Sequence, residues 1–132
     1  MAVTLWVLDK SAHVRLIAGA ELPAGISPAR LAMCEMGILE WLYSTRSARE
    51  FDAQNTELRA TFDVLAAPDD IFERVFRLQS DLAHYRGMWH RRAIGDLFIA
   101  EVARFHGAGV LHADSDFALI AKVRPDLALR TL

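Results

Sequence analysis

Short continuous apolar runs alternate along this chain with segments in which apolar residues recur every three or four positions. The run Val3–Leu8 ends abruptly at an acid and is typical of a central parallel strand covered on both faces. Residues 31–34, residues 62–66 and the pair Val110–Leu111 predict further short strands, and residues 127–132 predict an edge strand.

The segments between these runs have the pattern of helices. One clean apolar face is formed by Ile71, Val75, Leu78, Leu82 and Tyr85. Pro68 is a helix start signal before this face, and we interpret Asp69 and Asp70 as helix caps rather than ligands. Further helices are predicted after a cap at Ser11, over residues 36–43, 47–59 and 94–106, and from Phe117.

The helix over residues 36–43 is apolar on most of its surface, so we expect it to be well buried, whereas residues 47–59 predict a polar, peripheral helix. The order of elements, β-α-β-α-α-β-α-α-β-α-β, predicts an α/β fold with a mostly parallel central sheet flanked by helices on both faces. With 132 residues, we expect a single domain over residues 1–132.

Composition narrows the class of protein. The sequence is 53% hydrophobic and 24% charged, with a net charge of −2, so we expect an ordinary globule without general affinity for nucleic acid. No apolar run is long enough to span a membrane, and the first residues lack the basic leader of a signal peptide. The single cysteine, Cys34, rules out an internal disulfide and favours the cytoplasm.

Acidic residues recur where ligands bind in α/β proteins. Asp9 follows the first predicted strand, Asp114 and Asp116 follow the strand at Val110–Leu111, and Asp96 lies in the first turn of a helix. Because ligands bind outside the carboxyl ends of the strands and beside helix N-termini, these acids are expected to converge. For Asp9 alone, a shared capping role with Ser11 is the simpler alternative.

A glutamate inside the apolar helix is a fourth candidate. Glu40 would be costly there without a partner or a cation, although an ion pair with Arg46 or an exposed edge position would also explain it. Glu35, one turn earlier, is a weaker candidate because a glutamate near a helix start needs no other explanation.

Clustered carboxylates point to a bound cation. Two of them ~4 Å apart repel by roughly 4 kcal/mol at an effective dielectric constant of ~20. Oxygen-only ligands favour Mg²⁺ or Mn²⁺, and such a site suits hydrolysis of a phosphodiester. The five histidines show no metal-binding spacing and are mostly interpreted as surface residues, and Cys34 has no histidine near it in sequence.

Three segments resemble the acidic motifs of PIN-domain ribonucleases, most closely those of VapC-type toxins of bacterial toxin–antitoxin pairs. They are LDKSAHVRL from Leu8, LEWLYSTRS from Leu39, and HRRAIGDLFIAEVARFHGAGVLHADSDF from His90. The resemblance implies a PIN-like three-layer α/β/α fold. It also implies that the four acidic positions are filled by Asp9, Glu40, Asp96 and Asp114, with Ser11 and Asp116 in supporting roles.

The resemblance further implies an endoribonuclease that uses Mg²⁺ or Mn²⁺. Asp9, Asp96 and Asp114 would bind the metal, Glu40 would orient or deprotonate the attacking water, and the substrate would be cellular RNA. It implies a homodimer that is silenced by a small VapB-type antitoxin, whose C-terminal tail occupies the groove. A competing hypothesis is a PIN-fold domain that binds protein or RNA without cutting it.

Two arginines directly precede the acidic helix start. Arg91 and Arg92 stand close enough to Asp96 in sequence to predict charge-assisted contacts with RNA phosphates. A solvated loop is the alternative explanation. A phospho-acceptor receiver domain is a third functional class, but it would need a lysine after a late strand, and no such lysine is evident in the sequence. An aspartyl-phosphate phosphatase would need a second aspartate after Asp9, where the chain has Lys10 and Ser11.

Overall fold

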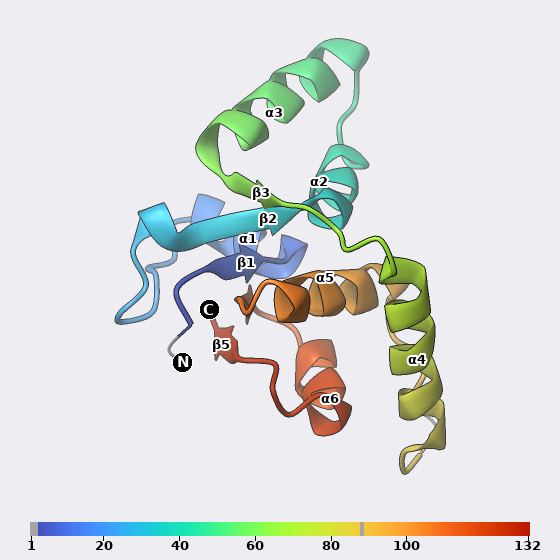
Figure 1. The fold of residues 1–132 in the computed structure, drawn as a ribbon. Coiled ribbons are helices and arrows are strands. Elements are labelled where there is room, and N and C mark those ends of the chain that lie inside the picture. Colours follow the sequence, from blue (N-terminus) through green and yellow to red (C-terminus); the bar gives the residue numbers. More distant parts are fainter. Residues whose placement is uncertain (1–2, 88) are drawn as a thin grey trace.

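The centre of the molecule is a five-stranded sheet in the order β3-β2-β1-β4-β5, shown in Figure 1 by a computed structural model that describes residues 3–87 and 89–132. Neighbouring strands all pair in parallel, which confirms the predicted parallel α/β sheet, and β5 forms the predicted edge. The strands are β1 (Trp6–Leu8), β2 (Leu31–Cys34), β3 (Asp63–Leu65), β4 (Gly109–His112) and β5 (Leu129–Thr131).

Helices connect the strands in the predicted order. They are α1 (Lys10–Ile17), α2 (Glu35–Leu42), α3 (Ala48–Thr61), α4 (Ile71–His84), α5 (Ile94–Phe105) and α6 (Asp116–Val123), with a short 3₁₀ turn at Pro28–Arg30. In the part of the chain that the structure describes, no helix is both long and apolar enough to cross a membrane.

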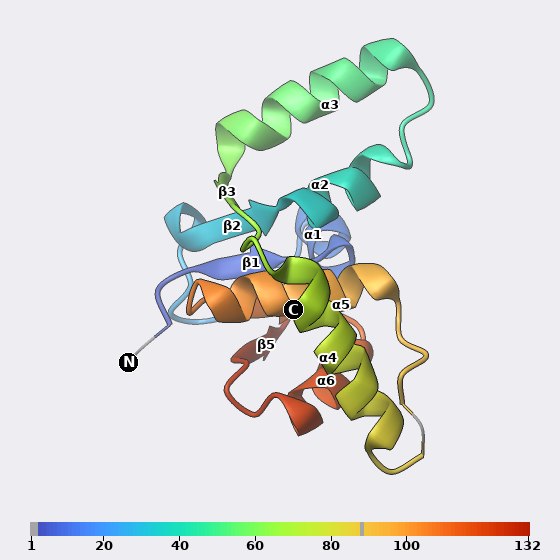
Figure 2. The same ribbon diagram turned by 45° about the vertical axis from the view of Figure 1, so that its right-hand side comes forward.

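Alternating side chains of the central strands build two separate cores. Val7 and Val110 are fully buried against residues of α4, α5 and α6, whereas Leu8 and Leu111 are fully buried on the other face, beside Ala12 of α1. Successive residues of a strand point to opposite faces, so both faces of these short strands must be apolar. The result is the expected three-layer arrangement, and Figure 2 shows α4 lying across α5 and α6.

The pair α2 and α3 forms a smaller third core at the β2–β3 side of the sheet, at the top of Figure 1. Ile38 and Leu42 of α2 pack there against Leu58 of α3. The expectation that α2 is buried on most of its surface is wrong, because Leu39 is 59% exposed and Tyr43, which caps the helix, is 90% exposed. Both side chains line an open groove.

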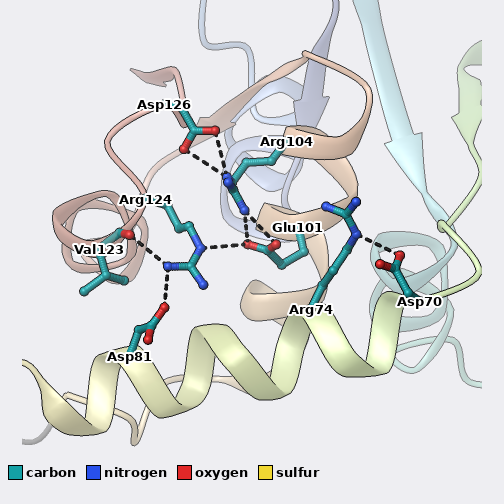
Figure 3. Close-up of polar contacts among 8 residues, drawn as sticks. All are labelled: Asp70, Arg74, Asp81, Glu101, Arg104, Val123, Arg124 and Asp126. Atoms are coloured by element: carbon teal, nitrogen blue, oxygen red, sulfur yellow. Dashed lines mark hydrogen bonds and ion pairs between the residues drawn. The ribbon is translucent and has the colours of Figure 1, made fainter.

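A network of charged side chains, none of which lines that groove, joins α4, α5 and α6 (Figure 3). Glu101 of α5 is 1% exposed, and both its carboxylate oxygens accept hydrogen bonds from Arg104 at 2.8 and 2.9 Å. Arg124, just after α6, reaches Glu101 at 3.5 Å and Asp81 of α4 at 2.7 Å. Arg104 also binds Asp126, so one buried acid organises three helices and the approach to β5.

Two predicted helix caps differ in the structure. Asp9, not Ser11, caps α1: its Oδ1 accepts a hydrogen bond of 2.9 Å from the backbone N–H of Ala12. Asp70 occupies the cap position of α4, but its carboxylate binds Arg74 at 2.8 Å and makes no capping hydrogen bond. The alternative that Asp9 takes part in capping α1 is therefore confirmed, whereas the interpretation of Asp70 as a side-chain cap is wrong.

Candidate active site

The candidate site lies where the chain reverses its direction across the sheet. After the central strand β1, the chain first adds β2 on one side of it and later β4 on the other side. The connections that leave β1 and β4 therefore run in opposite directions from two neighbouring strands. In open α/β sheets, this switch point leaves a crevice beyond the carboxyl ends of the strands. Asp9 directly follows β1, and Asp114 lies two residues beyond β4.

Three predicted ligands meet at this crevice. Carboxylate oxygens of Asp9, Asp96 and Asp114 all lie within 4.8 Å of one another. Asp9 is 2% exposed and Asp96 is 7% exposed, so two of the three carboxylates are withdrawn from water. Asp96 reaches the cluster from the first turn of α5, whose N-terminus favours a negative charge.

Ser11 links two sides of the cluster. Its Oγ lies 2.7 Å from both carboxylate oxygens of Asp9 and donates a hydrogen bond to that group. The same oxygen accepts a 3.0 Å hydrogen bond from the backbone N–H of Ala113, on the loop that carries Asp114. Ser11 therefore fixes the acid after β1 relative to the loop after β4, as a supporting residue would.

The loop that carries Asp114 has its own restraints. Nδ1 of His112 lies 2.7 Å from the carbonyl oxygen of Asp114 and donates to it, and the backbone N–H of Asp116 donates to Asp114 Oδ1 at 2.9 Å. His112 is 5% exposed and His13 is 6% exposed, so the interpretation of the histidines as mostly surface residues is wrong for these two. His112 lies only two residues before Asp114, and this closeness in sequence was the signal that could have placed His112 near the site.

Glu40 lies at the same cluster, and Glu35 does not. Glu35 is exposed and bound by both terminal nitrogens of Arg59 at 2.8 Å. Glu40 lines the groove beside the three aspartates, and its carboxylate packs against Gly95 in the first turn of α5. A β-carbon at position 95 would overlap Glu40 Oε1, so Gly95 provides space that sequence reasoning missed.

The surroundings disfavour the charged form of several of these acids. Burial, followed by repulsion from Asp114 and Asp9, raises the pKa of Asp96 from 3.8 to about 8. Burial also raises the pKa of Asp9, although hydrogen bonds from Ala12 and Ser11 oppose this. The pKa of Glu40 is raised by burial and then by the negative charge of Asp9, with Lys10 opposing.

An open groove of about 830 Å³ leads to the acids. It is lined by the polar residues Asp9, Ser11, Glu40, Asp96, Asp114 and Asp116, and also by Lys10, Val14, Arg15, Leu39 and Tyr43. Arg92 lies beside the cluster, but its guanidinium binds Asp116 at 3.0 Å and the carbonyl of Trp89 at 3.3 Å. Arg91 is exposed, and its predicted contact with RNA stays a prediction.

The three aspartates fit a hard divalent cation. Mg²⁺ binds oxygens at about 2.1 Å, so two oxygens on opposite sides of one ion are roughly 4.2 Å apart. Carboxylate oxygens within 4.8 Å of one another are compatible with sharing one ion, directly or through water. The donor set contains only oxygen, which favours Mg²⁺ or Mn²⁺ over zinc.

Comparison with known families defines the class of this protein. The model of the PIN domain matches residues 4–123, which include all four candidate acids. The chain belongs to the PIN-domain family.

Two curated relatives are similar over most of their length. Ribonuclease VapC17 of Mycobacterium tuberculosis is 63% identical over 93% of this chain and 92% of its own. Ribonuclease VapC21 of the same species is 35% identical over 91% of this chain and 88% of its own.

Solved structures share the fold. The VapBC-5 toxin–antitoxin structure from Mycobacterium tuberculosis covers 98% of both chains with a TM-score of 0.62 and 25% identity. VapBC-1 from nontypeable Haemophilus influenzae aligns with a TM-score of 0.71 at 18% identity, over 96% of this chain and 97% of that chain. The PIN-like three-layer fold inferred from sequence is therefore confirmed.

Proposed function

We propose that this chain is a metal-dependent endoribonuclease that acts as the toxin of a toxin–antitoxin pair. The observation that carries the proposal is the meeting of Asp9, Asp96 and Asp114 within 4.8 Å in a chain of the PIN family. Similarity to proteins named ribonuclease over nine-tenths of their length supports RNA as the substrate.

The side chains of this cluster have distinct roles in the proposed reaction. Asp9, Asp96 and Asp114 would hold Mg²⁺ or Mn²⁺, which when bound supplies Lewis-acid stabilisation of charge on the phosphate and activates water. Ser11 fixes the orientation of Asp9 through its hydrogen bond. Glu40, whose pKa is raised by burial and then by the charge of Asp9, orients or deprotonates the attacking water.

Asp116 and Arg92 act at the rim of the site. Asp116 supports Asp114 through its backbone N–H, and its carboxylate is neutralised by Arg92 at 3.0 Å. This ion pair limits the negative charge at the groove mouth, where the RNA backbone must approach. We take residues 1–132 as one nuclease domain that works in the cytoplasm.

The proposed protein partner is a VapB-type antitoxin whose tail lies in the groove. The similar VapBC-5 structure supports this partner, since it belongs to the VapBC family of toxin–antitoxin systems. We also expect a homodimer. Phe72 and Phe76, on one side of α4, are 77% and 67% exposed and would be covered by a second copy, which light scattering of wild type and a Phe72→Ser/Phe76→Ser variant would test.

Purified protein without antitoxin provides the direct test of the nuclease. We expect cleavage of cellular RNA that requires Mg²⁺ or Mn²⁺, stops with EDTA and is abolished by Asp96→Asn. Induced expression should stop growth and degrade RNA with wild type, but not with Asp96→Asn. Cleavage that survives full chelation would contradict the metal mechanism, and intact RNA with both proteins would favour the non-catalytic binding domain.

A further inference from the structure

Two side chains of α2 lie over the first turn of α5. Met36 and Glu40 are four residues apart in α2, so they project from the same face of that helix. A β-carbon at position 95 would lie 2.9 Å from the carboxyl carbon of Glu40 and 3.6 Å from Cγ of Met36. Gly95 is therefore where the first turn of α5 meets this face of α2.

The backbone at this position does not require a glycine. Gly95 is the second residue of α5 and its φ is not positive, unlike the φ of Gly107 just beyond the same helix. Glycine is, after proline, the residue that favours a helix least. The absence of a side chain at position 95 therefore has its reason in the surroundings of α5 and not in its backbone.

The group that a side chain at this position would displace is the end of Glu40. Outside α5, the atoms nearest to the missing β-carbon all belong to side chains, and the closest are Oε1 and the carboxyl carbon of Glu40. Rotation about the bonds of a glutamate side chain can move these atoms, so the fold would tolerate an alanine while the carboxylate would have to leave its place. Because Glu40 lines the groove beside the three aspartates, the damage would fall on the site.

We infer that Gly95 is a positioning residue of the cleavage reaction. Because it has no side chain, the carboxylate of Glu40 rests against the first turn of α5, from which it acts on the attacking water. The N-terminal end of a helix carries a partial positive charge, which favours a carboxylate in this place. The inference rests on the proposed function and adds to it a residue that acts only through Glu40.

The first experiment measures RNA cleavage by Gly95→Ala in Mg²⁺. We expect kcat to fall roughly 100-fold, as loss of general acid–base catalysis predicts, with KM nearly unchanged because the groove keeps its other side chains. Glu40→Gln should lose a similar factor. The matched control is Gly37→Ala in α2, which should keep the wild-type kcat. Its β-carbon would make ordinary contacts, at 3.5 Å from Met33 and 3.6 Å from Leu8.

A double variant shows whether Gly95 acts through Glu40. If it does, Gly95→Ala in a Glu40→Gln background costs no further activity, since the side chain that the methyl group displaces has already lost its function. Losses that multiply would overturn the inference. A kcat of Gly95→Ala within roughly twofold of wild type would overturn it as well.

Two solution measurements do not depend on cleavage. The Mn²⁺ affinity of Gly95→Ala, measured by calorimetry, should equal that of wild type because the three aspartates stay in place. Its melting temperature should be the same or higher, because alanine favours a helix more than glycine does. Weaker Mn²⁺ binding would assign the effect to Asp96, the next residue, and a lower melting temperature would assign it to the fold. Either result would overturn the inference.

A crystal structure of Gly95→Ala tests the displacement itself. We expect the carboxylate of Glu40 to lie away from the first turn of α5, and an unmoved carboxylate would overturn the inference. The proposed function fails in a different way. Wild type that binds Mn²⁺ but never cleaves RNA would refute the nuclease, whereas wild type and Gly95→Ala that cleave equally well would refute the inference alone.

Discussion

Helix α5 carries two buried acids whose surroundings have opposite charge. Asp96, in the first turn, is 7% exposed and faces the carboxylates of Asp9 and Asp114. Glu101, five residues later, is 1% exposed and is bound by the guanidinium groups of Arg104 and Arg124. Burial alone therefore does not distinguish an acid that supports the fold from an acid that supports chemistry.

Glu101 and Asp96 differ in the source of the positive charge that balances each carboxylate. Glu101 finds its counter-charge within the chain, and its hydrogen bonds tie three helices together. Asp96 finds further negative charge, and its pKa is raised to about 8 by burial and by neighbouring acids. A proton or a cation from solution must balance that cluster, so the metal-free fold is strained where Asp96 lies and relaxed where Glu101 lies.

The largest expected effect on stability comes from removing the carboxylate of Glu101, which is paired with two arginines. Glu101→Gln leaves two partly buried arginines without their shared carboxylate, so we expect the free energy of unfolding to fall by about 2–4 kcal/mol. Urea denaturation measures this. The matched control is Glu73→Gln, which removes an exposed pairing with Arg77 and should cost below about 0.5 kcal/mol. Equal losses in both variants would show that the Glu101 network adds nothing special.

Removing the carboxylate of Asp96, which has no positive partner in the cluster, should instead raise the stability of the metal-free protein. In EDTA at pH 7, Asp96 must take up a proton when the wild-type chain folds, a cost that the neutral asparagine avoids while keeping the shape, so we expect a gain of ~1 kcal/mol, or about 2–6 °C in melting temperature. Mg²⁺ should then raise the melting temperature of wild type more than that of the variant. If Asp96 served only the helix start, asparagine would replace it well and the melting curves would coincide, with and without metal.

The pH dependence sharpens the same comparison. An aspartate has a pKa near 3.9 in the unfolded chain. Because Asp96 titrates at about 8 in the metal-free fold, the folded state binds its proton more tightly. The stability it contributes is fully present below about pH 4 and is lost as pH rises through about 8. We expect the wild-type stability of metal-free protein to decline over that window more steeply than that of Asp96→Asn, whereas parallel profiles would contradict the raised pKa.

The smallest expected effect concerns Arg92, which binds Asp116 beside the cluster. Arg92→Ala frees the carboxylate of Asp116 and makes the site more negative, so Mn²⁺ affinity measured by calorimetry should rise a few-fold. Arg91→Ala is the matched control, because this neighbour is exposed and should leave metal affinity unchanged. Arg91→Ala should instead reduce the salt dependence of RNA binding by about one phosphate contact. Unchanged metal affinity in both variants would show that Asp116 does not influence the cluster.

Site residues could be predicted from sequence where the neighbouring residues in the chain decide their position. An acid directly after a buried strand lies at the sheet edge whatever surrounds it, so the positions of Asp9 and Asp114 could be predicted from sequence alone. Asp96 followed from the helix start. Glu101 could not be identified, because within the segment AEVARF it looks like an ordinary surface acid, and its partner Arg124 lies 23 residues further along.

Failures arose where packing between distant segments decided the outcome. The helix over residues 36–43 was expected to be well buried, yet Leu39 and Tyr43 line the groove, on a side that the elements packed against α2 leave open. The role of Gly95 was equally hidden. Its lack of a side chain matters only because Glu40, 55 residues earlier in the chain, occupies that space.

The central position of β1 has a consequence for synthesis of the protein. Strand β1, made before the others, pairs with β4, so the candidate acids Asp9 and Asp114 come together across 105 residues of chain. A growing chain on the ribosome that has not yet reached Asp114 cannot assemble the cluster, because β4 and its loop are missing. Translation therefore yields a chain without the assembled cluster until β4 and its loop have been read. The proposed antitoxin would have that interval in which to be ready.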